Sequence, residues 1–460
     1  MRVFRTQTLA AIKKDIEKTH LKKDLGVTDL LLLGLGGIIG IGIFVLTGLA
    51  AAQYAGPAIT LSFIIGGIAC IFTALAYAEL GAMLPVSGST YTYVYATLGE
   101  GIAAFVGWVV VMLYTYGAAT VAAGWSGYVL GIFDSIGIHF SPVWTKIPSQ
   151  GGWINLPAVF IVCVLTLLLI RGTKEATKLN GILVFVKIAA IFWFLFAAVP
   201  HIDAKNWEVF APHGFFGVAA GAGFVFMSYT GFDTLVTAAE ECRNPNRDLP
   251  IAIIGSLLGS AILYVAVSGV LTAIAPYASL NNPEPMTFAL RQHGVHIGAK
   301  LVATGAIAGM TTVILSQIFG QSRILFVMAR DGLMPPIFTR LNKRFASPHF
   351  GLIFSGMLMA AIAGFVPVGT LGQLSSMSTL LAFSFVSLSV MIMRFKKPNE
   401  HRPFRCPAVY GVATVSALLC LFLFAQLLPE NWKPFLFSSV VGIFIYAVYG
   451  FRHSKMNHHK

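Results

Sequence analysis

Long apolar segments alternate with short polar ones between residues 29 and 450. The apolar segments are continuous and about 20 residues long, which is the length of a helix that crosses a bilayer. A membrane-spanning strand would show about ten residues of alternating polarity. Bounding the segments by proline, glycine and charge predicts twelve membrane helices, at 29–52, 58–83, 102–130, 154–170, 179–199, 217–239, 250–275, 300–329, 351–367, 371–393, 408–428 and 433–450. The pattern therefore predicts an all-α integral membrane protein.

The amino-acid composition supports this fold class. Hydrophobic residues make up 57% of the chain and charged residues 11%, with a mean hydropathy of +0.79. A soluble domain carries about 25% charged residues. The first 28 residues are polar and basic, so we expect no cleaved signal peptide. The five cysteines are scattered without CxxC spacing, so we expect neither a disulfide framework nor a metal site.

Lysine and arginine are concentrated in alternate loops. If the N-terminus is cytoplasmic, the inner segments hold 24 of them and the outer segments hold 5. This bias predicts a multi-pass cell-membrane protein with both termini in the cytoplasm. Contact of these basic loops with anionic lipid headgroups explains the net charge of +13. We therefore expect the lipid bilayer, and no nucleic acid, as the partner of this charge.

Two of the predicted helices are interrupted near their middle. The first contains GLGGIIGIGIFVLT at 34–47, with five glycines, each of which weakens a helix by about 1 kcal/mol relative to alanine. The sixth is interrupted by MSYTG at 227–231. Close helix packing is the alternative role for such glycines. However, paired breaks five helices apart are typical of inverted repeats with a binding site at their interface.

Four motifs resemble those of a known family. They are Gly40-Ile41-Gly42-Ile43-Phe44, AYAELGAMLPVSGSTYTY at 76–93, GFDTLVTAAEECRNPNRDLP at 231–250 and SRILFVMARDGLMP at 322–335. Their order and spacing resemble the amino acid–polyamine–organocation (APC) superfamily, in particular bacterial relatives of the cationic amino acid transporters, over most of residues 24–395.

This resemblance implies a leucine-transporter-like fold. Two inverted five-helix repeats, with helices 1 and 6 broken, would be followed by two further helices. The chain would then divide into a cytoplasmic N-terminal segment (1–28), a first repeat (29–199), a second repeat (200–393) and a final part with two helices and a cytoplasmic C-terminus (394–460).

A free amino acid is a zwitterion, and a broken helix can bind both of its charges. The first helix rises from inside to outside, so its outer half begins at the break with free N–H groups that suit a carboxylate. We expect the substrate carboxylate on the backbone of Gly40, Ile41 and Gly42. We expect the ammonium on the carbonyls of Ile38, Met227 and Thr230. Family members often carry threonine or serine at position 41, so Ile41 departs from the family pattern by lacking a hydroxyl group.

Two ionisable residues fall in or beside these helices. Lys187 lies mid-span in the fifth helix, where a charge costs at least ~2.5–3.5 kcal/mol. Similar proton-coupled permeases carry a lysine where sodium-coupled relatives bind a cation, so the resemblance implies that Lys187 couples proton binding to transport. The alternative is a permanently charged lysine held by a carbonyl or by Asp233. Asp233 would pair with Lys187, cap the inner half of helix 6 or face a cationic substrate.

Two further positions concern the substrate side chain. Gln317 matches a side-chain-pocket position in similar permeases, and an interhelical hydrogen bond is its alternative role. Leu113 stands where relatives of the cationic transporters commonly carry a glutamate. If Lys187 neutralises Asp233, no spare negative charge remains, which favours neutral over cationic amino acids. Charges at the predicted cytoplasmic helix ends form either an inner gate of ion pairs or a solvated rim: Glu79, Glu240, Glu241, Arg243, Arg247 and Arg323.

Together these features predict a secondary transporter that imports an L-amino acid by alternating access, coupled to protons rather than sodium. An exchanger specific for cationic amino acids and a transporter-like amino acid sensor are the alternatives. An enzyme is not expected, because the sequence contains no HExxH, GxSxG or Walker motif. No cofactor is expected apart from the coupling proton, and nothing in the sequence specifies a small membrane partner.

Overall fold

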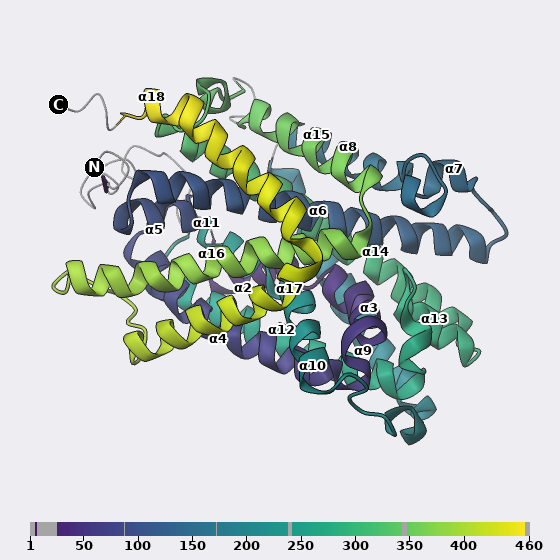
Figure 1. Cartoon of the computed structure of the whole chain (residues 1–460). Coiled ribbons are helices and arrows are strands. Elements are labelled where there is room, and N and C mark those ends of the chain that lie inside the picture. The colour runs from purple at the N-terminus through teal and green to yellow at the C-terminus, as the bar shows by residue number, and fades with distance from the viewer. Residues whose placement is uncertain are drawn as a thin grey trace.

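The computed structural model describes residues 5–6, 25–86, 88–171, 173–237, 242–342 and 347–455, with the backbone alone at 173–179 and 237. Within these ranges the regular elements are all helical (Figure 1). An isolated β-bridge joins Leu25 and Cys242. The predicted all-α class is therefore confirmed for the described residues. Most of the predicted N-terminal segment, 1–28, lies outside them.

The helices follow one another along the chain with short connections. They are α2 (Val27–Ile38), α3 (Thr47–Ala50), α4 (Ile59–Met83), α5 (Ser89–Thr97), α6 (Glu100–Ser135), α7 (Pro142–Thr145), α8 (Leu156–Arg171), α9 (Thr173–Ala198), α10 (Gly214–Val225), α11 (Phe232–Thr237), α12 (Pro245–Ile274), α13 (Pro285–Gln292), α14 (His296–Arg330), α15 (His349–Phe365), α16 (Val368–Lys396), α17 (Val409–Ile445) and α18 (Phe451–His453). Short π- and 3₁₀-helical turns include η2 (Gly42–Leu46), η3 (Ala51–Ala55), η5 (Pro148–Gln150), η8 (Phe226–Tyr229) and η12 (Tyr446–Gly450).

Eight helical stretches among the described residues are long and apolar enough to cross a membrane. They are Val27–Met83, Glu100–Ser135, Asn180–His201, Gly214–Val236, Pro245–Ile274, His296–Arg330, Val368–Lys396 and Val409–His453. The first has 57 residues and the last has 45, each more than twice the length of about 20 residues that a single crossing requires. Two shorter apolar helices are Leu156–Arg171 and His349–Phe365.

The longest single helix, α17, folds back on itself. At Asn431 the backbone leaves helical geometry, with φ −126° and ψ 15°. Pro429 and Pro434 flank this point, and a proline inside a helix removes a backbone donor and kinks the chain. Figure 1 shows the two arms of α17 meeting at the bend. The prolines thus explain why the chain turns back here, between the two apolar segments predicted at 408–428 and 433–450.

The centre of the molecule is built on α6. It packs against both α14 and α16, while α12 packs against both α4 and α2. Both ends of the described chain meet at the start of α6, where the Glu100 N–H donates to the Arg5 carbonyl at 3.0 Å. The Ser454 hydroxyl donates to the Glu100 carboxylate at 2.6 Å. Residues 5 and 454 therefore lie on the same side of the helical bundle.

Candidate functional site

The first predicted break is present where the glycines cluster. Helix α2 ends at Ile38, Ile39 adopts extended geometry with ψ 105°, and helical structure resumes at Ile41, before the π-helical turn η2. Every residue from Gly36 to Leu46 is buried. The break therefore lies inside the protein, where its free backbone groups need partners other than bulk water.

The second predicted break is present in the segment predicted as the sixth helix, at 217–239. Helix α10 ends at Val225, η8 follows, Thr230 is extended with ψ 143°, and α11 begins at Phe232. Gly231 has φ +126°, a conformation that favours glycine. A Cβ atom at Gly231 would also lie 2.5 Å from the carbonyl carbon of Gly37. Both the backbone geometry and the close approach therefore require glycine here.

The two breaks pack directly against each other. Gly231 contacts Gly37, and a Cβ atom at Gly42 would lie 2.3 Å from the Cβ and Oγ atoms of Ser228. The Tyr264 hydroxyl lies 2.8 Å from the carbonyl oxygen of Ile38 and 2.7 Å from that of Ser228, so it bridges the two breaks. The structure thus brings the backbone residues singled out in the two broken helices to one buried place.

Several backbone and side-chain groups at the point where the two breaks meet already have hydrogen-bond partners in the protein. The Thr230 N–H donates to the Met227 carbonyl at 3.0 Å. The Met227 N–H donates to Ser376 Oγ at 3.1 Å, and the Thr230 and Thr379 hydroxyls lie 3.3 Å apart. A carbonyl oxygen has two lone pairs, so one hydrogen bond to Ile38 or to Met227 leaves acceptor capacity for another donor.

Lys187 reaches the end of α2 from α9. It is completely buried, and its Nζ donates to the carbonyl oxygens of Gly36 at 2.6 Å and Ile39 at 2.7 Å. A third bond goes to the Thr312 hydroxyl at 3.2 Å. The C-terminal end of a helix carries partial negative charge and unpaired carbonyls, so an ammonium group is favoured there. Lys187 therefore occupies a cation position at the first break.

Asp233 lies in the first turn of α11 and is buried. One carboxylate oxygen accepts from the Tyr114 hydroxyl at 2.7 Å, and the other accepts from the Gly231 N–H at 2.9 Å. A carboxylate at a helix N-terminus is stabilised by the helix dipole. Within the described part of the chain, no ion pair joins Lys187 and Asp233. Of the arrangements considered for these two residues, the structure contains the carbonyl-bound lysine and the capping aspartate.

The two side-chain-pocket candidates lie on the facing helices α6 and α14. Leu113 is buried on α6, and its carbonyl lies 3.4 Å from Ser375 Oγ. Gln317 packs on Gly117 of α6, where a Cβ atom would lie 2.6 Å from the Gln317 Oε1 atom. Among the described residues, Gln317 Oε1 accepts no hydrogen bond. The interhelical bond considered as its alternative role is therefore not formed through this oxygen.

Sequence reasoning missed three polar side chains at this site. Ser228 is buried beside Gly42, and its Oγ atom has no hydrogen-bond partner in the described ranges. The Tyr114 hydroxyl donates to Asp233, and the Tyr264 hydroxyl bridges the two breaks. A buried tyrosine hydroxyl in an apolar helix usually has a hydrogen-bond partner, so the sequence could have identified both tyrosines as candidate polar contacts at this site. An unsatisfied buried polar atom costs about 1–3 kcal/mol, so such atoms beside a helix break favour a ligand-binding role.

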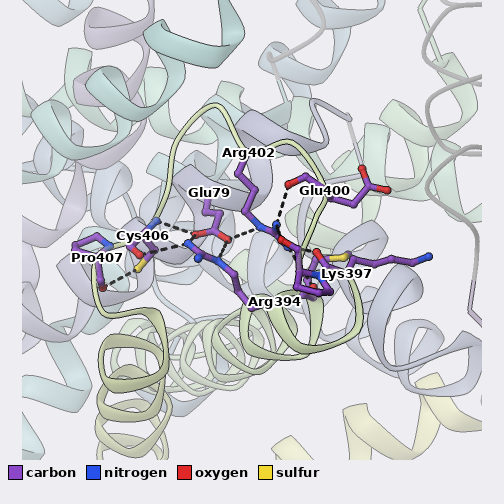
Figure 2. Close-up of polar contacts among 9 residues, drawn as sticks. Glu79, Arg394, Lys397, Glu400, Arg402, Cys406 and Pro407 are labelled. Carbon is purple, nitrogen blue, oxygen red and sulfur yellow. Dashed lines mark hydrogen bonds and ion pairs between the residues drawn. The ribbon is translucent and has the colours of Figure 1, made fainter.

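Glu79, at the end of α4, forms a buried ion-pair cluster. Arg394 donates to both of its carboxylate oxygens, each at 2.7 Å, and the Cys406 N–H donates to one of them at 2.7 Å (Figure 2). Arg402 Nε lies 3.1 Å from the other oxygen. The carboxyl side chain is 1% exposed. The cluster therefore ties α4 to the end of α16 and to the loop that follows it.

The loop 397–408 is organised by Arg402. Its guanidinium donates to four backbone carbonyls, those of Met393, Lys397, Pro398 and Glu400. The pKa of the Cys406 thiol is raised to about 11, mainly because the thiol is buried and to a smaller extent because the Glu79 carboxylate lies nearby. These polar contacts fix the loop against the end of α4 (Figure 2).

The other charged residues considered for an inner gate lie elsewhere. Arg243 and Arg247 are exposed, and the Arg323 guanidinium stacks on the Phe319 ring at 3.4 Å. Glu240 and Glu241 lie outside the described residues. Glu79 is buried beside Arg394 and Arg402, so it is not part of a solvated rim. Sequence reasoning did not single out these two arginines.

Comparison with known proteins identifies relatives over the full length. A family model described as amino acid permease matches residues 25–448. The branched-chain amino acid permease BcaP of Bacillus subtilis (strain 168) is 41% identical over 461 residues, covering 99% of each chain. The methylthioribose transporter of the same organism is 39% identical over 457 residues, again covering 99% of each.

Animal relatives are also similar. The human cationic amino acid transporter 4 is 35% identical over 399 residues, which is 85% of this chain and 63% of that protein. The similarity therefore extends to proteins with different named substrates.

Proposed function

Because this chain belongs to the amino acid permease family of the APC superfamily, we propose that it imports an L-amino acid across the cell membrane by alternating access in symport with protons. It is a multi-pass membrane protein of a transporter family, and the relatives compared with it are named as transporters or permeases. The observation that carries the proposal is the meeting of two broken helices in the buried centre. Lys187 and unpartnered polar atoms lie beside that meeting point.

The proposed architecture has twelve membrane helices in two inverted five-helix repeats followed by two more. Two of the eight long stretches, with 57 and 45 residues, are each long enough to cross twice. With the six other long stretches and the two shorter apolar helices, this allows twelve crossings. An even number of crossings is consistent with residues 5 and 454 lying on one side. With the bias in basic residues, both termini are assigned to the cytoplasm.

The substrate binds between the two breaks. Its carboxylate meets the backbone N–H groups around Gly40, Ile41 and Gly42, where the outer half of the first helix begins. Its ammonium meets the carbonyls of Ile38, Met227 and Thr230. Gly42 and Ser228 are too close in the structure for a side chain to fit between them. The breaks therefore separate to admit substrate and close again behind it.

Lys187 supplies the proton coupling. When protonated, its ammonium uses three donors to hold the Gly36 and Ile39 carbonyls and the Thr312 hydroxyl together. Loss of the proton removes the charge and one donor, which frees the end of α2 to move. These same oxygens would be the ligands of a sodium ion, and Lys187 occupies their centre. The arrangement favours protons over sodium.

A neutral amino acid fits the electrostatics better than a cationic one. Asp233 already accepts hydrogen bonds from Tyr114 and from Gly231. Leu113 contributes no charge to α6, and Lys187 adds positive charge at the break. Among the described residues beside the breaks, a second positive charge on the substrate side chain would find no unused carboxylate. The relative named as a branched-chain amino acid permease supports the same substrate class.

Transport by the purified protein in liposomes tests the proposal. An inward proton gradient should drive accumulation of radiolabelled L-valine, and a protonophore should abolish it. L-arginine and methylthioribose serve as comparison substrates. Lys187→Ala should lose gradient-driven uptake and retain substrate binding. Undiminished uptake by this variant with unchanged pH dependence would exclude the coupling role, and uptake that requires an internal amino acid would identify an exchanger.

A further inference from the structure

A cavity of about 300 Å³ lies between α6, the segment 140–150 and the start of α8. We call it the outer cavity, because it opens beside the loop that contains Lys146, which the charge bias assigns to the outside. The residues of its lining that matter here are Val45, Gly124, Ser126, Asp134, Lys146 and Asn155. Its volume lies at the lower end of the range of about 300–1,000 Å³ found for small-molecule sites.

The outer cavity lies next to the first helix break, because Gly124 in its lining packs against Ile41. A Cβ atom on Gly124 would lie 2.6 Å from Ile41 Cδ1 and 3.2 Å from Val45 Cγ2. The side chains of Ile41 and Val45 are buried against this glycine. Ile41 is itself one of the residues assigned to the substrate carboxylate. Two apolar side chains resting on a glycine therefore separate the outer cavity from the proposed transport site.

The mouth and wall of the cavity carry groups of opposite charge. Asp134 and Lys146 are both exposed, and Asp134 also pairs with His139 at 3.0 Å. On the wall, Asn155 Oδ1 accepts from the Ser126 hydroxyl at 2.7 Å, a bond in which the Asn155 amide NH₂ takes no part. A carboxylate, an ammonium and an amide donor around one small cavity suit a zwitterion.

Two neighbouring cavities lack this combination. The cavity between Trp125 and Phe160 is lined almost entirely by apolar side chains. The cavity beside the start of α14 is lined by Arg291, His296 and Lys300 and has no acidic residue in its lining. Neither offers separate partners for both charges of an amino acid. Neither lining includes a residue of η2, whereas Val45 of η2 lines the outer cavity.

We propose that the outer cavity is a second, transient binding site for a zwitterionic amino acid. The ammonium binds Asp134, and the carboxylate binds Lys146 and the Asn155 amide. The substrate moves on to the helix breaks when Ile41 and Val45 part from Gly124. This inference rests on the proposed function, since it names the place where the transported substrate first binds.

Kinetics in proteoliposomes provide the first test. Asp134→Asn and Lys146→Gln should each raise the KM for L-valine uptake three- to tenfold and leave Vmax within twofold, because the helix breaks are untouched. Asp203→Asn and Lys205→Gln are matched controls, since these exposed charges lie outside the cavity lining. Unchanged KM in both cavity variants, in a protein that transports, would overturn the inference and leave the transport function standing. No uptake by the unmodified protein would instead refute the transport function.

Thiol labelling provides the second test. In a Cys163→Ser background, the Val368→Cys variant places a thiol in the cavity lining, and a membrane-impermeant reagent is applied from outside. Saturating L-valine should slow this labelling several-fold. The protection should persist when Gly42→Val blocks the inner site. The Ile138→Cys control, exposed and outside the lining, should label equally with and without L-valine. Absence of protection, or its loss with Gly42→Val, would refute binding in the outer cavity.

Discussion

Glu79→Gln is the substitution with the clearest expected effect on stability. It preserves the size of the side chain and removes its charge, so it leaves Arg394 and Arg402 facing a neutral amide. At least one of the amide's hydrogen-bonding positions becomes a donor that faces donors from arginine or from the Cys406 N–H. The substitution therefore breaks the ion pair without opening a cavity.

The magnitude follows from burial. Glu79 is 1% exposed and the Arg402 side chain is 2% exposed, so water cannot replace the lost carboxylate. Breaking a buried ion pair by removing one partner costs about 3–5 kcal/mol. An unfolding entropy of about 2.1 cal/mol/K per residue amounts to about 1 kcal/mol/K for a chain of this length. The expected fall in Tm is therefore about 3–5 °C.

Thermal unfolding of the purified protein in detergent, followed by tryptophan fluorescence, measures this fall. Arg243→Gln is the matched control, because Arg243 is an exposed charge on the predicted cytoplasmic side, and an exposed charge contributes at most about 1 kcal/mol. Its Tm should change by less than about 1 °C. A Tm for Glu79→Gln that matches the wild-type value would refute the interpretation of Glu79 as a structural joint between α4 and α16.

Two further predictions concern the second break and the loop 397–408. Gly231→Ala should abolish L-valine uptake and lower Tm, because φ is +126° and the added Cβ would lie 2.5 Å from the Gly37 carbonyl carbon; strain of this kind costs about 1–3 kcal/mol. Gly411→Ala, with no atom within 4 Å of its Cβ position, is the control and should leave both unchanged. Maleimide labelling of Cys406, followed by mass spectrometry, should be slow at pH 8 and accelerate as the pH approaches 11, because the pKa is raised to about 11 and only the thiolate reacts. Labelling at pH 8 as fast as that of an ordinary cysteine, with a pKa of about 8.5, would contradict this assignment.

The positions of both breaks could be predicted because their causes are local. Five glycines in one apolar segment weaken the helix where α2 ends, and Gly231 supplies the backbone geometry that α11 needs in order to start. The apolar lengths likewise predicted helices that the structure contains. Local composition and backbone preference were sufficient for these features.

The partners of the charged residues could not be predicted in the same way. Lys187 bonds to Gly36, which lies 151 positions away, and Glu79 bonds to Arg394, 315 positions away. Such pairs depend on how the helices pack, and hydrophobic periodicity carries no information about them. The unpartnered Ser228 hydroxyl could not be predicted either. A serine in an apolar helix usually donates to a carbonyl of its own helix, so the sequence gives no reason to expect a free hydroxyl.

The most direct test of the proposed transport site is the stabilisation of the purified protein by L-amino acids. A ligand at 100 times its Kd adds about 2.7 kcal/mol of stability, which corresponds to a rise in Tm of about 3 °C. A neutral amino acid such as L-valine should produce this rise in the wild-type protein. Gly42→Val should melt cooperatively and show no rise, because the added side chain meets Ser228 between the breaks. A rise of the same size in Gly42→Val, or no rise with any of the twenty L-amino acids in the wild type, would contradict a substrate site at the two breaks.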